Sequence, residues 1–202
     1  MRTLFCFYDM SVSPCSYDFF VFLYSAEVSR IRRKLEKLKL ILIHGPKGLF
    51  RQDNIRTHDQ NLNFFHNVVI PGISLIPSCD SFLWLDRNEA SIDVSKELKF
   101  PRDYDPKKPT NEYLGHELVA SKIRQDEIAN FFAPKYAVNI ARQLIAEKLN
   151  GQPFITLTAR EIERDDVNKT RRINQKTWLS AINTLEERGI KTLIIRETEK
   201  AF

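Results

Sequence analysis

The sequence is poor in the residues that mark several classes of protein. Its 202 residues include only 6 glycines and 9 prolines, which excludes a collagen-like or linker-like chain. Three cysteines, Cys6, Cys15 and Cys79, form no CxxC pair and leave an odd count. Neither a disulfide framework nor a zinc-type spacing is therefore expected, and a reducing cytoplasm is the predicted location.

Long apolar runs are also missing. No stretch approaches the ~20 residues that a membrane-spanning helix needs. Asp9 and Asp18 interrupt the aromatic N-terminal region, which excludes a signal-peptide core. With 43% hydrophobic and 28% charged residues, the composition is that of a globular protein that folds without a metal or disulfide, and we expect it to be soluble.

The charge balance is mildly basic, at +5 from 31 basic and 26 acidic residues. Binding to nucleic acid would require these cations to gather on one face. The densest basic segment runs from Arg30 to Lys39 and lies at the end of a predicted helix, where cations complement the helix dipole. We favour a solvated helix end over an anion-binding surface, and we predict no nucleic-acid partner.

The first half predicts strands and helices in alternation. Residues 3–8, 38–44 and 81–86 form short apolar runs typical of a parallel sheet that is covered on both faces. Ser16 is the expected N-cap of a helix over 17–34. A second helix should begin near Leu62 and end near Ile70, because Pro71 and Gly72 follow. Residues 49–61 are polar and predict a loop.

The proline-rich segment 88–111 predicts a long surface connection between two halves. Beyond it, helices are expected over 134–149 and 174–188, closed by Asn150-Gly151 and by Gly189, with strands over 153–160 and 191–197. The predicted fold class is α/β: a Rossmann-like parallel-sheet domain over 1–110, followed over 111–202 by linker helices and the start of a second Rossmann-like domain.

Polar side chains follow the predicted strands, and ligands of open α/β sheets bind beyond the carboxyl ends of the strands. Every such position except Asp9 carries a cation, and an arginine there can give a phosphate or carboxylate a bidentate contact. The alternative for each is an ordinary polar strand terminus. The positions are Asp9, His44 to Arg51, Asp86-Arg87, Arg160-Glu161 and Arg196-Glu197.

The segment HGPKGLFR, from His44 to Arg51, is neither a Walker A loop nor a GxGxxG fingerprint. Gly45 and Gly48 would let the backbone approach a ligand, with Lys47 and Arg51 as charge partners. A tight turn that ends the strand is the alternative, and we favour it. Among the four histidines, His44 is the one at a predicted strand end, which makes it the candidate general base.

Two further patterns are not expected to bind a ligand. The adjacent acids Asp165 and Asp166 lie in a charged loop and are expected to be solvated, so no metal site is predicted. Aromatic residues of the first two elements stand at core-like positions, which favours packing over base stacking. They are Phe5, Phe7, Phe19, Phe20 and Phe22.

The second half reads FITLTARE, then a basic and asparagine-containing loop, then NQKTWLSAINTLEERGIKTLIIRETEK. It resembles the nucleotide-binding half of glycosyltransferases with the two-domain GT-B architecture, most closely bacterial surface-polysaccharide and fucosyltransferase-like members. The first half, with YDMSVSPCSYDFFVFLYSAEVSR and LILIHGPKGLFR, is similar to the N-terminal domain that accompanies such a half. The resemblance implies transfer of a sugar from a nucleotide-sugar, bound between two Rossmann-like domains, to a glycan acceptor, with no metal or other cofactor.

The resemblance also implies roles for individual residues. Arg160 matches the arginine that neutralises the donor diphosphate in fucosyltransferase-like enzymes, although Thr158 stands where the family has a histidine. Such a cation would stabilise the charge that develops on the leaving group. The expected catalytic residues are His44 and Arg160. The expected donor-binding residues are Arg160, Arg196, Glu197, Lys47 and Arg51.

The length does not fit a complete enzyme of this kind. A second GT-B domain would need five or six strands and about 150 residues by ordinary domain sizes. Only two such strands are predicted before Phe202. We therefore expect a truncated glycosyltransferase-like protein that is inactive alone, or a minimal relative that binds without turnover. The alternative is a non-enzymatic α/β module that binds a phosphorylated ligand or a partner protein.

Overall fold

A computed structural model describes residues 2–45, 50–51, 56–90, 94–111, 129–158 and 175–195. They divide into two compact units, one ending at Pro134 and the other beginning at Lys135. The predicted boundary between residues 110 and 111 adjoins residues 112–128, which lie outside the described ranges, and it stays a prediction.

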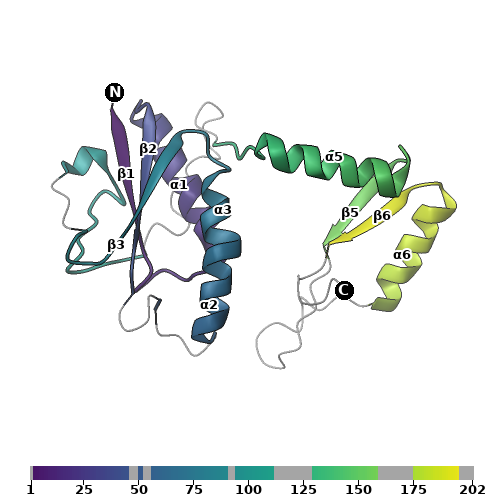
Figure 1. The fold of residues 1–202 in the computed structure, drawn as a ribbon, viewed down its shortest axis with the longest axis horizontal. Coiled ribbons are helices and arrows are strands. Elements are labelled where there is room, and N and C mark those ends of the chain that lie inside the picture. The colour runs from purple at the N-terminus through teal and green to yellow at the C-terminus, as the bar shows by residue number, and fades with distance from the viewer. Residues whose placement is uncertain are drawn as a thin grey trace. The chain divides into compact units, whose positions relative to one another are not determined.

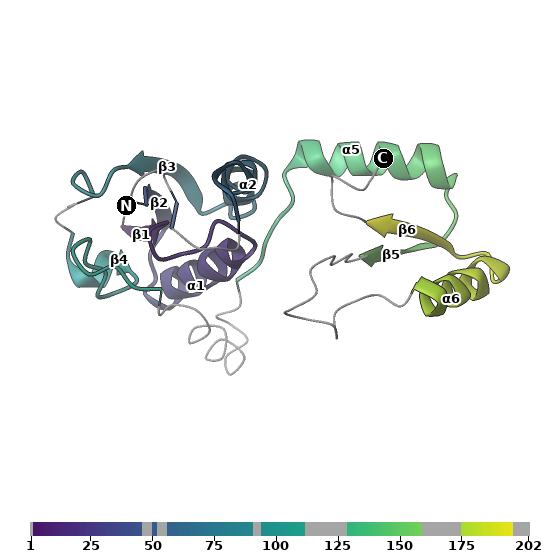
Figure 2. The same ribbon diagram turned by 90° about the horizontal axis from the view of Figure 1, so that it is seen from below.

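The first unit is built on a parallel four-stranded sheet in the order β3-β2-β1-β4 (Figures 1 and 2). Strand β1 spans Thr3–Asp9, β2 Lys37–Ile43, β3 Cys79–Leu85 and β4 Lys99–Phe100. Cys6 on β1 pairs with Leu40 on β2 and with Phe100 on β4. The chain thus runs outward from β1 to β3 and then returns to the opposite side of β1. This is a Rossmann-like order, and it confirms the predicted parallel α/β sheet.

Two helical segments cover one face of this sheet (Figure 2). The first is α1, Asp18–Arg32, and the second joins α2, His58–Phe64, to the π-helix η1, Phe65–Val69, and to α3, Ile70–Ile73. Alternate side chains of β1 and β2 point into this layer because the side-chain period of a strand is two. The core they form includes Leu4, Cys6, Tyr8, Leu38, Leu40, Leu42, Phe19, Phe22, Phe65 and Val69.

The other face is covered by the chain between β3 and β4 and just beyond β4. Phe7, Ile41 and Ile43 pack there with Ala90 and Tyr104. Among the described residues of this crossover the helical element is a single 3-10 turn, η2, Lys96–Leu98. The predicted surface connection over 88–111 is therefore wrong in part. It contains β4, which is two residues long and gives no periodicity to detect, and its side chains reach the core.

The second helical segment corrects two predictions. Thr57 caps α2 by accepting from the Gln60 amide at 3.3 Å, so the predicted loop ends at residue 57 rather than 61. The helix also continues past Ile70 to Ile73. Within η1 the Ile70 amide donates to the Phe65 carbonyl, an i→i+5 bond whose wider turn accommodates the ring and the missing N–H of Pro71.

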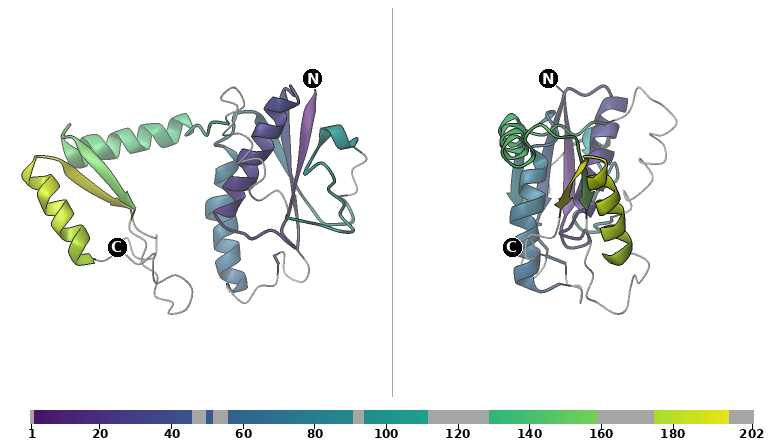
Figure 3. Two further views of the ribbon diagram at one scale, coloured as in Figure 1. Left: turned by 180° about the vertical axis from the view of Figure 1, so that it is seen from behind. Right: turned by 90° about the vertical axis from the view of Figure 1, so that its right-hand side faces the viewer.

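The second unit contains α5, Lys135–Leu149, β5, Phe154–Thr158, α6, Gln175–Glu187, and β6, Lys191–Ile195. Strands β5 and β6 are parallel, with Phe154 opposite Lys191, and α6 connects them (Figure 3). This confirms the predicted strand–helix–strand pattern. Gly151 and Gly189 both have φ of 74°, the left-handed conformation expected where each helix ends.

Candidate ligand site at the carboxyl edge of the sheet

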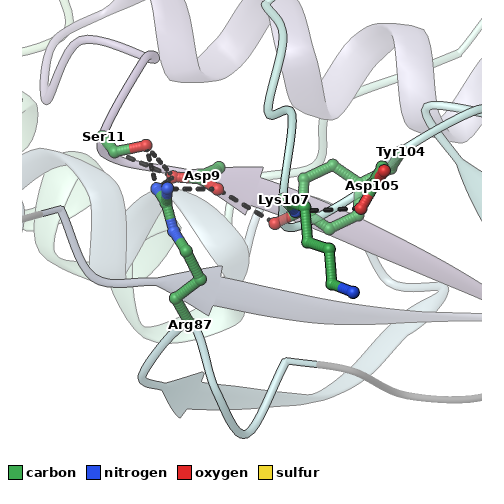
Figure 4. Close-up of polar contacts among 6 residues, drawn as sticks. All are labelled: Asp9, Ser11, Arg87, Tyr104, Asp105 and Lys107. Carbon is green, nitrogen blue, oxygen red and sulfur yellow. Dashed lines mark hydrogen bonds and ion pairs between the residues drawn. The ribbon is translucent and has the colours of Figure 1, made fainter.

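The strand order places the topological switch point of the first unit between β1 and β4. Open α/β sheets bind ligands beyond the carboxyl ends of their strands at such a point. Asp9 is the last residue of β1, and Tyr104 follows β4 by four residues. Their side chains meet there, together with Ser11 and Arg87, and we take these four residues, the Asp9 cluster, as the candidate site (Figure 4).

The Asp9 carboxylate is the centre of the cluster and is only 1% exposed. Its Oδ1 accepts from the Ser11 amide at 2.9 Å and from the Ser11 hydroxyl at 2.6 Å. Its Oδ2 accepts from the Tyr104 hydroxyl at 2.9 Å. A buried charge is tolerated only when it is paired and hydrogen-bonded, and these contacts meet that requirement together with Arg87.

Arg87 comes from the turn that follows β3. Its Nη2 lies 3.2 Å from Asp9 Oδ1 and also donates to the Ser11 hydroxyl. The turn is shaped by the Asp86 carboxylate, which accepts from the amides of Asn88 at 2.7 Å and Glu89 at 3.1 Å. The Arg87 side chain is 39% exposed, so its guanidinium reaches solvent while Asp9 does not.

Tyr104 closes the β4 side of the cluster. Its ring stacks on Phe7 with 4.7 Å between centroids and an interplanar angle of 12°. Burial, and then the neighbouring Asp9 carboxylate, raise the pKa of Tyr104, so its hydroxyl remains a hydrogen-bond donor. Because Tyr104 is 4% exposed, the group that the cluster offers to a ligand is Arg87.

The segment after β2 has its own packing. The His44 ring lies 5.0 Å from the Trp84 ring, and no contact joins it to the Asp9 cluster in the described part of the chain. A Cβ on Gly45 would come within 2.6 Å of the Phe50 backbone carbon. The small residue here thus admits the protein's own chain. Residues 46–49, which would complete the predicted turn, lie outside the described residues, and the turn stays a prediction.

Among the remaining predicted site residues, Arg51 lies in the described part of the chain. Arg51 Nη1 donates to the Val12 carbonyl at 3.3 Å, which brings it to the turn that follows Asp9. Most of the others lie outside the described residues, so their roles stay predictions. These are Lys47, Gly48, Arg160, Glu161, Asp165, Asp166, Arg196 and Glu197.

The basic segment at the end of α1 is engaged in intramolecular contacts. Arg30 forms hydrogen bonds to the Glu27 carboxylate at 2.7 and 2.8 Å and donates to the Leu35 carbonyl. Arg33 donates to the Lys99 carbonyl at 2.7 Å. These arginines therefore tie α1 to its neighbours, which agrees with a helix end more than with an anion-binding surface.

Sequence reasoning missed Ser11 and Tyr104. Ser11 is an ordinary turn residue by type, and Tyr104 lies in a segment whose prolines and charges indicate a surface. The available signal was Asp9, an acid that directly continues an apolar strand. Its burial and its partner Arg87, 78 positions away, depend on the tertiary fold.

Two features are absent from the described ranges. No group of three or more His, Cys, Asp or Glu side chains there could hold a metal ion. No helix there is long and apolar enough to cross a bilayer.

A scan against protein-family models, a search of curated proteins and a search of solved structures each found no match.

Proposed function

We propose that this is a glycosyltransferase-like protein that binds a nucleotide-sugar and transfers the sugar to an acceptor. The observation that carries the proposal is the Rossmann-like sheet with a buried acid and a solvent-reaching arginine at its switch point. A Rossmann-like fold alone hosts many functions. The proposal therefore joins this geometry to the resemblance of the second half to nucleotide-binding domains.

The chemistry of such a transfer requires positive charge where the nucleoside diphosphate leaves. We assign that role to Arg160, which the resemblance places on the donor diphosphate. Asp9 is unsuited to deprotonate an acceptor hydroxyl, because both of its oxygens already accept hydrogen bonds. His44 therefore remains the candidate general base.

A second function, ligand binding without turnover, is favoured by the same observation. The acid at the switch point is buried and fully hydrogen-bonded, and the His44 ring packs beside Trp84. Both features suit a site that holds a ligand in place without proton transfer.

Isothermal titration of the full chain with uridine and guanosine diphosphates tests the proposal. We expect one of them to bind, and Arg160→Ala to weaken binding about tenfold or more, as expected for a lost charge-assisted contact. Arg142→Ala, at an exposed position of α5, removes the same charge as the matched control and should leave the affinity unchanged. Absence of binding by the unaltered protein would reject the proposal.

Release of nucleotide from the corresponding nucleotide-sugars separates the two functions. A transferase releases the nucleoside diphosphate when an acceptor is added, and His44→Ala should slow that release. Binding without release under any acceptor would favour the non-enzymatic function.

A further inference from the structure

We propose that Arg87 binds an oxyanion, a carboxylate or a phosphate, on the ligand of the first unit. The inference rests on the proposed function only in naming that ligand the acceptor, which would then be an acidic sugar or a sugar phosphate. It concerns a residue different from Arg160 and a different unit of the protein.

The guanidinium of Arg87 is fixed from one side. Its contacts with Asp9 and Ser11 all involve Nη2. The Nε and Nη1 groups, with three N–H donors, have no partner among the described residues, and the side chain is 39% exposed. An arginine held in this way presents donors to solvent in a defined orientation, which lowers the entropy lost when a ligand binds.

The turn after β1 gathers a second cation. Arg51 Nη1 donates to the Val12 carbonyl, and the Val12 amide in turn donates to the Asp9 carbonyl. The guanidinium groups of Arg51 and Arg87 therefore both contact the short turn after β1. They come from the loops that follow β2 and β3.

The acids next to Arg87 in the chain do not pair with its guanidinium. The Asp86 carboxylate is engaged by the amides of Asn88 and Glu89, and the Glu89 carboxylate accepts from the Asp86 amide at 3.2 Å. Both acids thus serve the turn that carries Arg87. The local arrangement favours an anion over a cation or a neutral sugar at the exposed side of the guanidinium.

The side-chain Nε–Hε resonance of Arg87 gives a direct test by NMR. The signal is identified as the one missing from Arg87→Lys, and the full chain is titrated with methyl phosphate, glucuronate and neutral glucose at constant ionic strength. We expect a saturable shift with methyl phosphate or glucuronate and none with glucose. The anion that binds with the higher affinity shows whether the acid group is a phosphate or a carboxylate. No saturable shift with either anion, or an equal shift with glucose, overturns the proposal.

Substitutions test the same site by affinity. Arg87→Lys keeps the charge and a partner for Asp9 but loses the planar fork, and we expect it to weaken anion binding about threefold to tenfold. Arg102→Ala removes an exposed arginine that is paired with Glu97 in the same unit, and it is the matched control. Unchanged affinity in Arg87→Lys and in Arg87→Ala would contradict the inference. Arg87→Lys remains informative if Arg87→Ala fails to fold.

The two proposals fail in different ways. If the unaltered protein binds no nucleoside diphosphate but does bind an anion at Arg87, the proposed function is rejected and this site is kept. Diphosphate binding that depends on Arg160, with no anion effect at Arg87, would keep the proposed function and reject the acidic acceptor.

Discussion

The Tyr104 hydroxyl donates a 2.9 Å hydrogen bond to the Asp9 carboxylate, which joins the end of β1 to the chain that follows β4. These residues are 95 positions apart, and the contact lies at the switch point of the sheet. The bond supplies a buried carboxylate with one of its donors and holds the segment beyond β4 against Phe7.

Tyr104→Phe keeps the ring on Phe7 and removes the hydroxyl. We expect the first unit to lose about 1–2 kcal/mol of unfolding free energy, because a buried carboxylate oxygen loses a hydrogen-bond donor. Urea denaturation followed by Trp84 fluorescence in a Trp178→Phe background reports this unit alone. Tyr17→Phe, at a 65% exposed position, is the control and should change stability little. Equal stability of Tyr104→Phe and the parent would contradict the role of the bond.

Stability should also depend on Tyr104 at alkaline pH. Burial raises its pKa in the folded state, whereas an unfolded tyrosine ionises near ~10. Above that pH the unfolded state loses a proton that the folded state keeps, so stability falls as pH rises. Buried thiols also lower the stability of the folded state as pH rises. The measurement is therefore the difference in unfolding free energy between the parent and Tyr104→Phe, followed from pH 9 to 11.5. A difference that does not change over this range would show that Tyr104 is not the cause.

The three thiols should react slowly in the folded protein. Burial raises the pKa of Cys15 to about 12 and that of Cys79 to about 11, and it also raises the pKa of Cys6. The thiolate is the reactive form, so little of it is present at pH 8. Iodoacetamide labelling followed by mass spectrometry should find all three modified in denaturant and hardly any in the native state. Rapid native labelling of any one of them would be inconsistent with this placement.

Gly45→Ala should destabilise the first unit by about 1–3 kcal/mol, the usual cost of forcing extra volume into a packed site. The added Cβ would lie 2.6 Å from a backbone carbon of Phe50, which cannot turn away. Gly72→Ala is the comparison, because its Cβ would meet the Phe20 ring at 2.7 Å and a ring can move. Thermal unfolding should rank Gly45→Ala as the less stable variant, and the reverse order would argue against the backbone contact.

Much of the fold was predictable from local patterns. The runs around Leu40 and Phe154 are apolar and bounded by turn residues, and the glycines at 151 and 189 end helices as expected. Strand β4 was not predictable, because two residues carry no period and its pairing depends on β1. The same limit applies to the candidate site. Arg87 was recognisable as a cation after a strand, but the fold alone brings it to Asp9 and brings Tyr104 onto Phe7.

Hydrogen exchange of the full chain tests most directly whether the carboxyl edge of the four-stranded sheet binds the ligand. Exchange is compared in methyl phosphate, at a concentration near its dissociation constant for the parent protein, and in sodium chloride of equal ionic strength. We predict slower exchange in peptides that cover residues 9–13 and 86–90, no change in residues 135–149, and a smaller effect in Arg87→Lys, because its affinity for the anion is about threefold to tenfold lower. Unchanged exchange at both turns, or equal slowing in Arg87→Lys, would contradict the account.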